Sequence, residues 1–551
     1  MGRHLALLAA FVLTALPAGA ALVEVGTDDV GVLFSGDPLI DFQSPVLVEN
    51  PDDDHLVYLW HEDDGTGRTA LRGAVTTFEA TASVVAFPFA IDAGVGQTRR
   101  VAAAYDDRAE RFLVVWEEDG IGGVDGAFEI WGRLLGRDYA PIGDPFRIST
   151  MGTSDTDVAF DAGAPDVAVN TTDNEFVVVW HGDDDGVGKA DGAFEVFARR
   201  ITSDGTLLGT GRDPISDLAG TTVSTEPAIA FDDFHREYLV AHSGHASTGA
   251  FTPTIRVNRL GVDGLPVDGG TFTDFGVGAG AGDLERNPDL AYDSRGNRFL
   301  LAWDAVAPAP GGEVRVQARP IDLAQDLLAL PVQRVSTAPS GGDRLRVARD
   351  PAVAYGFGAD GFVVTWSGSP SLVDTGELEI VAREVDRDGV PRGTAIPISA
   401  MGAPGDPLFE AVTPTVVGSR QDGLFATCWS GTYQAPGNFG LFGQALQIDV
   451  ATSTPDDRRP HRLALRAAPN PFNPATTIAF DLPRDGRAVI TVHDVRGARV
   501  RTLVDASLTA GVHQRVWDGR DDRGAAVGSG VYFARVVHQG GSVERKLVLV
   551  K

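Results

Sequence analysis

The sequence predicts an all-β protein in which a seven-bladed β-propeller, closed by its own N-terminal strand, is followed by a small antiparallel β-sandwich. Three observations lead to this prediction. A motif of about 60 residues recurs along most of the chain. Apolar residues fall in short runs of Val, Ile, Leu and Phe between turns rich in Gly and Asp, which favours strands. At 551 residues, the chain is too long for one ordinary core.

Residues 1–20 have the features of a cleavable secretory signal. A basic start at Arg3 precedes an apolar stretch from Leu5 to Leu16, and the small residues Ala18, Gly19 and Ala20 follow. The apolar run is shorter than the roughly 20 residues that span a bilayer, and no later segment is apolar enough to do so. We therefore expect a protein that is secreted or displayed on the outer cell surface, without a transmembrane segment.

The repeat is defined by a tryptophan that closes an apolar run. Successive markers are 56, 64, 62, 61, 63 and 63 residues apart, and a proline lies 15 residues before the marker in six of the seven units, with Val101 in the other. The markers are Trp60, Trp116, Trp180, His242, Trp303, Trp366 and Trp429. The prolines are Pro45, Pro165, Pro227, Pro288, Pro351 and Pro414. We expect the tryptophans to be core residues.

Each unit reads as four short strands, the size of one propeller blade. In the fifth unit, PDLAYD predicts the first strand and FLLAW the second; EIWGRLL and GDPFRIS in the second unit illustrate the third and fourth. The seventh unit lacks a fourth strand, and the segment GDPLIDF at 36–42 resembles the missing one. We therefore expect residues 21–449 to form a ring that this N-terminal segment closes. Immunoglobulin-like domains in series would need about 100 residues per unit.

After a linker at 450–468, residues 469–551 predict a sandwich of about seven strands. This part resembles the type A C-terminal sorting domain of type IX secretion, which has an immunoglobulin-like fold related to a flagellar hook-cap protein. The matching elements are Pro469 to Pro474, Asp494 to Gly497, Trp517 to Gly519, Gly530 to Tyr532 and the basic end from Arg545 to Lys551. His493 departs from the family's usual Tyr. The resemblance implies the type IX secretion machinery as a partner; a plain adhesive β domain is the alternative.

Charge and cysteine content exclude several classes of function. The net charge is −30, and residues 21–449 alone carry −37 whereas residues 469–551 carry +4. Such a field opposes binding of nucleic acid or anionic membranes. The one cysteine, Cys428, excludes an internal disulfide and a cysteine zinc site. It lies in an apolar run, so we expect a small buried residue.

The residues directly after the repeat markers should form a ring on one face, where the loops between second and third strands gather. They are His61, Glu117, His181, Ser243, Asp304, Ser367 and Ser430. Acidic loops follow in the first three units, and oxygen-rich loops of this kind bind Ca²⁺. The candidate ligands are Asp63, Asp64, Glu118, Asp119, Asp183, Asp184 and Asp185. Solvated turns are the alternative, and no other cofactor is indicated.

The sequence supports two functions and does not decide between them. The favoured one is a non-enzymatic propeller that binds or displays an extracellular glycan or protein ligand. The alternative is an extracellular polysaccharide hydrolase or lyase that uses carboxylates of the acidic loop face. Nucleophile elbows, phosphate loops and metalloprotease motifs are not found in the sequence.

Overall fold

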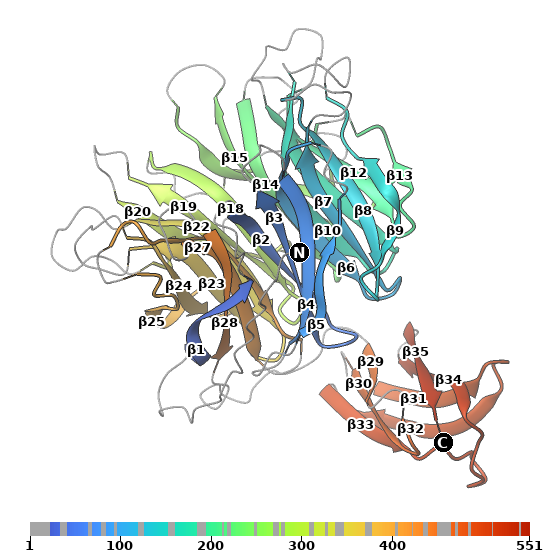
Figure 1. Ribbon diagram of the computed structural model, residues 1–551. Coiled ribbons are helices and arrows are strands. Elements are labelled where there is room, and N and C mark those ends of the chain that lie inside the picture. Colours follow the sequence, from blue (N-terminus) through green and yellow to red (C-terminus); the bar gives the residue numbers. More distant parts are fainter. Residues whose placement is uncertain are drawn as a thin grey trace, which may run out of the picture. The chain divides into compact units, whose positions relative to one another are not determined.

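The structure of the protein is a computed structural model with strands as its only regular elements among the described residues (Figure 1). These are 22–33, 41–63, 69–78, 84–92, 96–119, 126–151, 160–183, 194–211, 214–216, 222–246, 251–267, 275–276, 282–307, 313–324, 329–336, 347–369, 377–402, 406–420, 423–432, 439–448, 464–468, 472–482, 486–509, 511–538 and 541–550. No helix in these ranges is long and apolar enough to cross a membrane. The predicted signal at 1–20 lies outside them. The chain divides into two compact units, 1–453 and 454–551 apart from residues 294–296.

Seven four-stranded antiparallel sheets make up the first unit, one for each repeat. Sheet 1 contains β2 (Asp41–Asn50), β3 (His55–Asp63), β4 (Thr69–Thr77) and β5 (Val84–Ala90). Sheet 2 contains β6 (Thr98–Asp106), β7 (Arg111–Glu118), β8 (Glu129–Gly136) and β9 (Pro141–Arg147). Sheet 3 contains β10 (Ala162–Asn170), β11 (Glu175–Gly182), β12 (Glu195–Thr202) and β13 (Leu207–Leu208). Four strands per repeat confirm the prediction.

The remaining sheets follow the same order along the chain. Sheet 4 contains β14 (Thr222–Asp232), β15 (Glu237–Ala246), β16 (Thr254–Gly261) and β17 (Phe275–Gly276). Sheet 5 contains β18 (Leu284–Asp293), β19 (Arg298–Val306), β20 (Val314–Ile321) and β21 (Gln333–Arg334). Sheet 6 contains β22 (Ala348–Gly356), β23 (Gly361–Gly368), β24 (Glu379–Val385) and β25 (Pro391–Pro397). Sheet 7 contains β26 (Ala411–Gly418), β27 (Leu424–Thr432), β28 (Phe439–Ile448) and, as its fourth member, β1 (Leu22–Leu33).

The N-terminal strand completes the last sheet, but a different segment does so than the sequence predicted. β1 pairs antiparallel with β28, from Leu22 opposite Ile448 to Leu33 opposite Leu441 (Figure 1). Residues 36–40 of the predicted segment lie outside the described residues. Asp41 and Phe42 already belong to β2, where Phe42 pairs with Glu62, so they are not available to β28.

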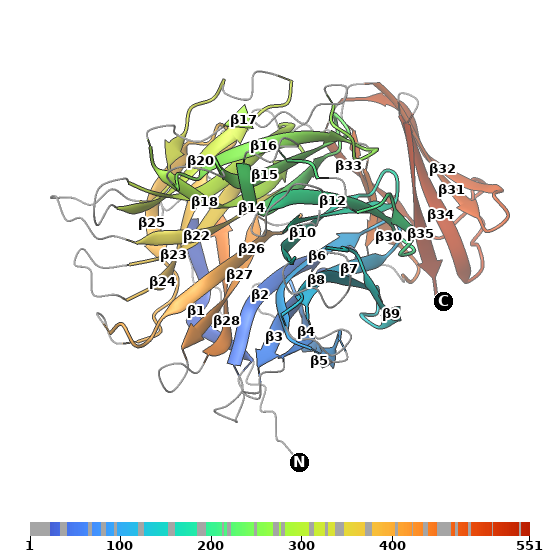
Figure 2. The ribbon, with the colours of Figure 1, turned by 90° about the horizontal axis from the view of Figure 1, so that it is seen from above.

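The first strands of the seven sheets contact one another in chain order. The contacts run from β2 to β6, β10, β14, β18, β22 and β26, and β26 in turn contacts β2. Figure 2 shows these strands nearest the middle of the unit, with β5, β9, β17 and β25 at its outside. Successive sheets therefore pack face to face, and each buries both of its faces.

The repeated apolar run of the second strand follows from this packing. In β11, Val178 and Trp180 belong to a core shared with sheet 2, whereas Val177 and Val179 belong to a core shared with sheet 4. Both faces of the strand are covered, so the run is apolar throughout. All six marker tryptophans are at most 3% exposed, and Cys428 is fully buried, as expected.

The C-terminal unit contains two antiparallel sheets with a core around Trp517 and Phe480. One sheet has the order β29 (Ala464–Ala468), β30 (Thr476–Leu482) and β33 (Gly511–Trp517). The other has the order β32 (Arg499–Leu508), β31 (Gly486–Asp494), β34 (Gly530–His538) and β35 (Gly541–Leu549). β29 lies in the segment expected to be linker, so the folded part begins no later than Ala464.

Candidate functional site

The repeated proline marks a β-bulge in the first strand of each sheet. Pairing with the second strand skips residues at this point, so a proline without an N–H group is tolerated there. Sheet 2, with Val101 in place of proline, has the same irregularity. The residue before the proline position has a positive φ in all seven sheets. These residues are Ser44, Arg100, Ala164, Glu226, Asn287, Asp350 and Thr413, with φ between 38° and 55°.

The residues after the repeat markers lie directly beside these bulges. Each pairs with the residue two positions before the proline position: Gln43 with His61, Arg99 with Glu117, Gly163 with His181, Thr225 with Ser243, Arg286 with Asp304, Arg349 with Ser367 and Val412 with Ser430. They therefore occupy equivalent positions in the seven sheets, as the repeat predicts. Several of them contact bulge residues. We call Glu117, His181, Glu226, Asn287, Asp304 and Asp350 the bulge cluster.

Asn287 links carboxylates from three successive sheets. Its side-chain Nδ2 donates to Asp304 Oδ1 at 2.8 Å and to Asp350 Oδ1 at 3.0 Å. Its backbone N–H donates to Glu226 Oε2 at 3.1 Å. The left-handed backbone at Asn287 turns both donors toward acids of sheets 4, 5 and 6. One residue thus holds three carboxyl groups together.

Burial raises the pKa values of three acids in the cluster, Asp304, Asp350 and Glu117. Burial raises the pKa of Asp304 to about 7, opposed by the hydrogen bond from Asn287 and reinforced by the charges of Asp350 and Glu226. Burial also raises the pKa of Asp350, and Arg349 opposes this shift. The pKa of Glu117 is likewise raised by burial. Near neutral pH the cluster therefore contains both proton donors and proton acceptors.

His181 supplies a neutral imidazole at the same place. The backbone N–H of Glu226 donates to His181 Nδ1 at 3.2 Å, so Nε2 carries the proton in the neutral ring. Burial lowers the pKa of His181 to about 3, and Arg100 lowers it further. A Cβ atom added at Gly163 would lie near both His181 Nε2 and Glu117 Oε1, so these two groups share one small space.

Arginines flank the cluster and remain partly open to solvent. Arg100 Nε lies 3.8 Å from Glu117 Oε1 with 55% of its side chain exposed. Arg349 Nε lies 3.5 Å from Asp350 Oδ2 with 44% exposed. The site thus presents charged donors beside carboxyl groups, an arrangement suited to a ligand with several hydroxyl groups or to proton transfer.

The predicted calcium ligands that the structure describes lie in the first three sheets and are not members of the bulge cluster. Asp63, Glu118, Asp119 and Asp183 are described; Asp64, Asp184 and Asp185 lie outside the described residues. Within the described ranges, no three His, Cys, Asp or Glu side chains are placed to hold a metal ion. Calcium binding by these loops stays a prediction.

Two of these acids have structural partners that compete with a metal. Asp119 accepts the backbone N–H of Gln97 on Oδ1 at 2.7 Å and that of Gly126 on Oδ2 at 2.9 Å. Glu118 accepts the indole N–H of Trp116 at 2.9 Å, and burial raises its pKa to about 7. Glu118 and Asp119 thus each have a role within sheet 2 that does not involve a metal ion.

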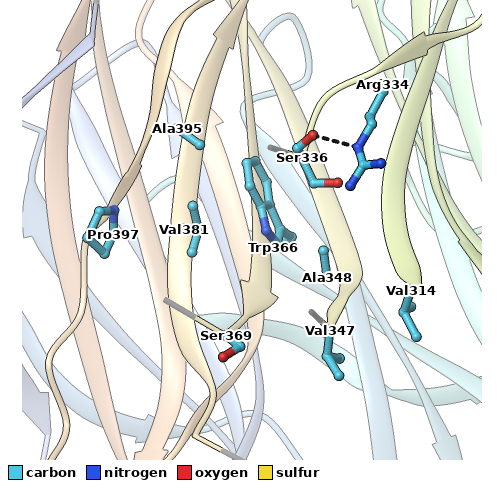
Figure 3. A pocket seen from close by; sticks show the side chains of 10 residues that line it. All are labelled: Val314, Arg334, Ser336, Val347, Ala348, Trp366, Ser369, Val381, Ala395 and Pro397. Atoms are coloured by element: carbon cyan, nitrogen blue, oxygen red, sulfur yellow. Dashed lines mark hydrogen bonds between the residues drawn. The ribbon is translucent and has the colours of Figure 1, made fainter. Parts of the chain in front are cut away.

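A small pocket between sheets 5 and 6 has a packing origin (Figure 3). It is lined by Val314, Arg334, Ser336, Val347, Ala348, Trp366, Ser369, Val381, Ala395 and Pro397. At equivalent gaps, Met151 packs against Gly182 and Met401 against Gly431. The corresponding residue here is Ala338 in the sequence, which lies outside the described residues. The sequence thus has alanine at this position where the other two units have methionine. Arg334, which lines the pocket, is already bonded to Glu313.

Glu226, Asn287 and Asp350 were not singled out from the sequence. The residue before a proline is normally extended with a negative φ. The repeated proline therefore did not predict a left-handed residue at the bulge. The available signal was a polar or charged residue at the same place in three successive units, directly before the repeated proline.

Comparison with known proteins identifies part of the C-terminal unit. The model of the family described as FlgD Ig-like domain matches residues 470–542. This agrees with the immunoglobulin-like fold that the resemblance implied. No curated protein sequence matches the chain.

Among solved structures, the chain is similar to several all-β proteins at low identity. A phage phi92 endosialidase is 10% identical with a TM-score of 0.40, over 96% of this chain and 87% of that one. An α-L-arabinanase of Penicillium chrysogenum is 9% identical with a TM-score of 0.38, over 77% of this chain and 98% of that one. PorZ, a surface component of the type IX secretion system of Porphyromonas gingivalis, is 12% identical with a TM-score of 0.28, over 92% and 70%. Likeness at this level carries no argument about function.

Proposed function

We propose that this chain is an exported protein that binds an extracellular ligand at the bulge cluster, on the secreted or surface-displayed side of the cell envelope. The observation that carries this proposal is the bridge from Asn287 to Asp304 and Asp350, supported by Glu226. Three carboxyl groups from three successive sheets repel one another, so bringing them together costs stability. A site that must present acceptors and donors to a ligand accounts for this arrangement.

We propose that residues 21–449 form a closed seven-bladed propeller and that the signal at 1–20 is removed on export. The contact of β26 with β2 and the pairing of β1 with β28 support closure. In such a ring, the seven bulges surround one end of the central axis, so the bulge cluster faces a shared opening. Propellers commonly use this opening for ligands.

Export through type IX secretion is proposed for the C-terminal domain, residues 469–551 together with β29. The immunoglobulin-like match at 470–542 and the basic end support it. Deleting residues 464–551 should leave the propeller in the periplasm of a type IX-competent host, whereas the full chain reaches the surface. Surface delivery of the truncated chain would reject this part of the proposal.

A second candidate function, cleavage of an extracellular polysaccharide, is favoured by one distance. Asp304 Oδ1 and Asp350 Oδ1 bond the same amide nitrogen at 2.8 and 3.0 Å. They therefore lie less than about 6 Å apart, a bound that includes the 5–5.5 Å between the two carboxyl groups of retaining glycosidases. Asp304, protonated near neutral pH, would be the acid, and Asp350 the nucleophile or base.

Binding to glycan and protein arrays by purified chain tests the main proposal. We expect the wild type to bind at least one array member, and Asn287→Ala and Asp304→Asn to lose that binding. Asp388→Asn is the matched control, because its carboxylate is exposed on a turn between β24 and β25 at the other end of the strands. Equal binding by wild type and cluster variants would reject the bulge cluster as the site. Release of reducing sugar from the bound glycan, lost in Asp304→Asn, would establish the second candidate.

A further inference from the structure

An exposed aromatic ring lies beside the bulge cluster. Phe251, in the connection between β15 and β16, is 54% exposed. Its ring makes an edge contact with the imidazole of His245 at 4.6 Å between centroids. The guanidinium carbon of Arg286 lies over the same ring, 5.0 Å from its centroid. The ring of Phe251 is large, apolar and open to water. His245 and Arg286 hold it in place from two sides.

Arg286 joins this ring to the carboxylates. It is the cross-strand partner of Asp304 in the pairing of β18 with β19, which places their Cβ atoms about 5 Å apart. Its charge lowers the pKa of Asp304, against the larger effect of burial. Within the described residues, the buried Arg286 Nε has no hydrogen-bond partner. Nε itself is closed to a ligand, but Arg286 as a whole is only partly buried, so the rest of its guanidinium group can donate to a ligand between the ring and Asp304.

We propose that Phe251 and Arg286 form a stacking subsite for a sugar ring, and that the ligand of the bulge cluster is a glycan. The inference rests on the proposed function and names its ligand class. The apolar C–H face of a sugar packs on an aromatic ring, and its hydroxyl groups bond to carboxylates and guanidinium groups at the edge. Phe251, Arg286 and Asp304 supply these three elements side by side.

Exposure of a phenylalanine alone does not define such a subsite, and the same sheet contains a suitable comparison. Phe234 is 51% exposed and also makes an edge contact with a histidine, His235, at 4.8 Å. It lies in the turn between β14 and β15, at the opposite end of the strands. No arginine lies over its ring among the described residues. Phe234→Ala is therefore a matched control for Phe251→Ala.

Affinity electrophoresis of the purified full chain in gels containing arabinan, galactan, polygalacturonate or alginate tests the inference. We expect at least one polysaccharide to retard the wild type and Phe234→Ala. Phe251→Ala should weaken that binding about tenfold or more, and Phe251→Trp should preserve it. Unchanged melting temperatures of the Phe251 variants would show that folding is not affected.

Two outcomes would overturn the inference. In one, Phe251→Ala binds the retarding polysaccharide as tightly as Phe234→Ala does. In the other, neither these polysaccharides nor a glycan array binds the wild type, while a protein ligand binds it and is lost in Asn287→Ala. The second outcome would reject a glycan ligand but leave the bulge cluster as the binding site, so the two proposals fail separately.

Discussion

Arg199 Nη1 donates a hydrogen bond to the backbone carbonyl oxygen of Ile148, 2.6 Å away in the segment that leaves the preceding sheet. The relationship is repeated. Arg133 Nη1 donates to the carbonyl of Ile91 at 2.6 Å, and Arg383 Nη1 to that of Val335 at 2.8 Å. These arginines occupy equivalent positions in the third strands. Each one fastens its sheet to the preceding sheet at the outside of the unit.

Replacing Arg199 by leucine should destabilise the first unit by about 1–3 kcal/mol, because the carbonyl of Ile148 loses a charged donor in a half-buried place. Burial lowers the pKa of Arg199, which shows that its environment is poorly solvated. Urea denaturation monitored by tryptophan fluorescence measures the change. Arg108→Leu is the control: Arg108 also donates to a carbonyl, that of Thr172 at 3.2 Å, but in an exposed position. A loss of equal size in Arg108→Leu would contradict the explanation.

Trp180→Ala should cost about 3–5 kcal/mol of unfolding free energy, the usual loss for a buried aromatic residue. Trp180 is fully buried and stacks on Phe197 with 5.9 Å between ring centroids. Trp180→Phe should cost much less, since within the described residues the indole Nε1 has no hydrogen-bond partner to lose. Near-equal stability of the alanine variant and the wild type in urea would show that the repeat marker is not a core residue.

The stability of the protein should depend on pH through Asp304. Its folded pKa of about 7 lies above 3.8, the ordinary value of an aspartate carboxyl group, so folding favours the protonated form. This contribution is complete below about pH 4 and is lost as pH rises toward 7. Asp304→Asn removes the titration. Relative to wild type, the variant should therefore gain up to about 4 kcal/mol between pH 4 and pH 8, at about 1.4 kcal/mol per unit of pKa shift.

Urea midpoints of Asp304→Asn and wild type, taken at several pH values, provide the measurement. Asp388→Asn should run parallel to wild type, because its carboxylate is largely exposed. A constant difference between Asp304→Asn and wild type from pH 4 to pH 8 would mean that Asp304 titrates as an ordinary exposed carboxyl group.

Asp119→Asn should lower stability by about 1–3 kcal/mol in calcium and in chelator alike. Asp119 accepts backbone N–H groups from Gln97 and Gly126, and an asparagine amide would turn an NH₂ group toward one of these donors. Melting temperatures in excess calcium and in a chelator check this expectation. If calcium stabilises the wild type but not the variant, Asp119 is a metal ligand after all.

The sequence predicted the number of sheets and of strands in each, but it did not predict which segment pairs with β28. Repeat spacing and turn residues predicted seven sets of four strands, and the apolar run around Trp180 predicted that this residue is buried. The closing strand was predicted at 36–42 because the sequence there, GDPLIDF, resembles GDPFRIS. Strand pairing is exclusive, however, and Phe42 is already bonded into sheet 1 opposite Glu62.

Only the residues of the bulge cluster that lie on the second strands of their sheets were predicted. Residues after the repeat markers were expected to gather, and Glu117, His181 and Asp304 do lie in the bulge cluster. Their partners Glu226, Asn287 and Asp350 depend on a left-handed backbone, which is uncommon in non-glycine residues and is disfavoured further before a proline. Backbone strain of this kind arises from the packing of neighbouring strands, and local sequence preference does not encode it.

The pairing of Leu22 with Ile448 joins the two extremes of the first unit. Since β28 has no other neighbour on that side, its backbone groups stay unpaired until residues 22–33 return to it. The last sheet can thus be completed only when both ends of the first unit are present, and pairings between residues far apart in the sequence carry a cost of loop closure. A tag fused directly before Leu22 would compete with this step, whereas one placed after Lys551 would leave it undisturbed.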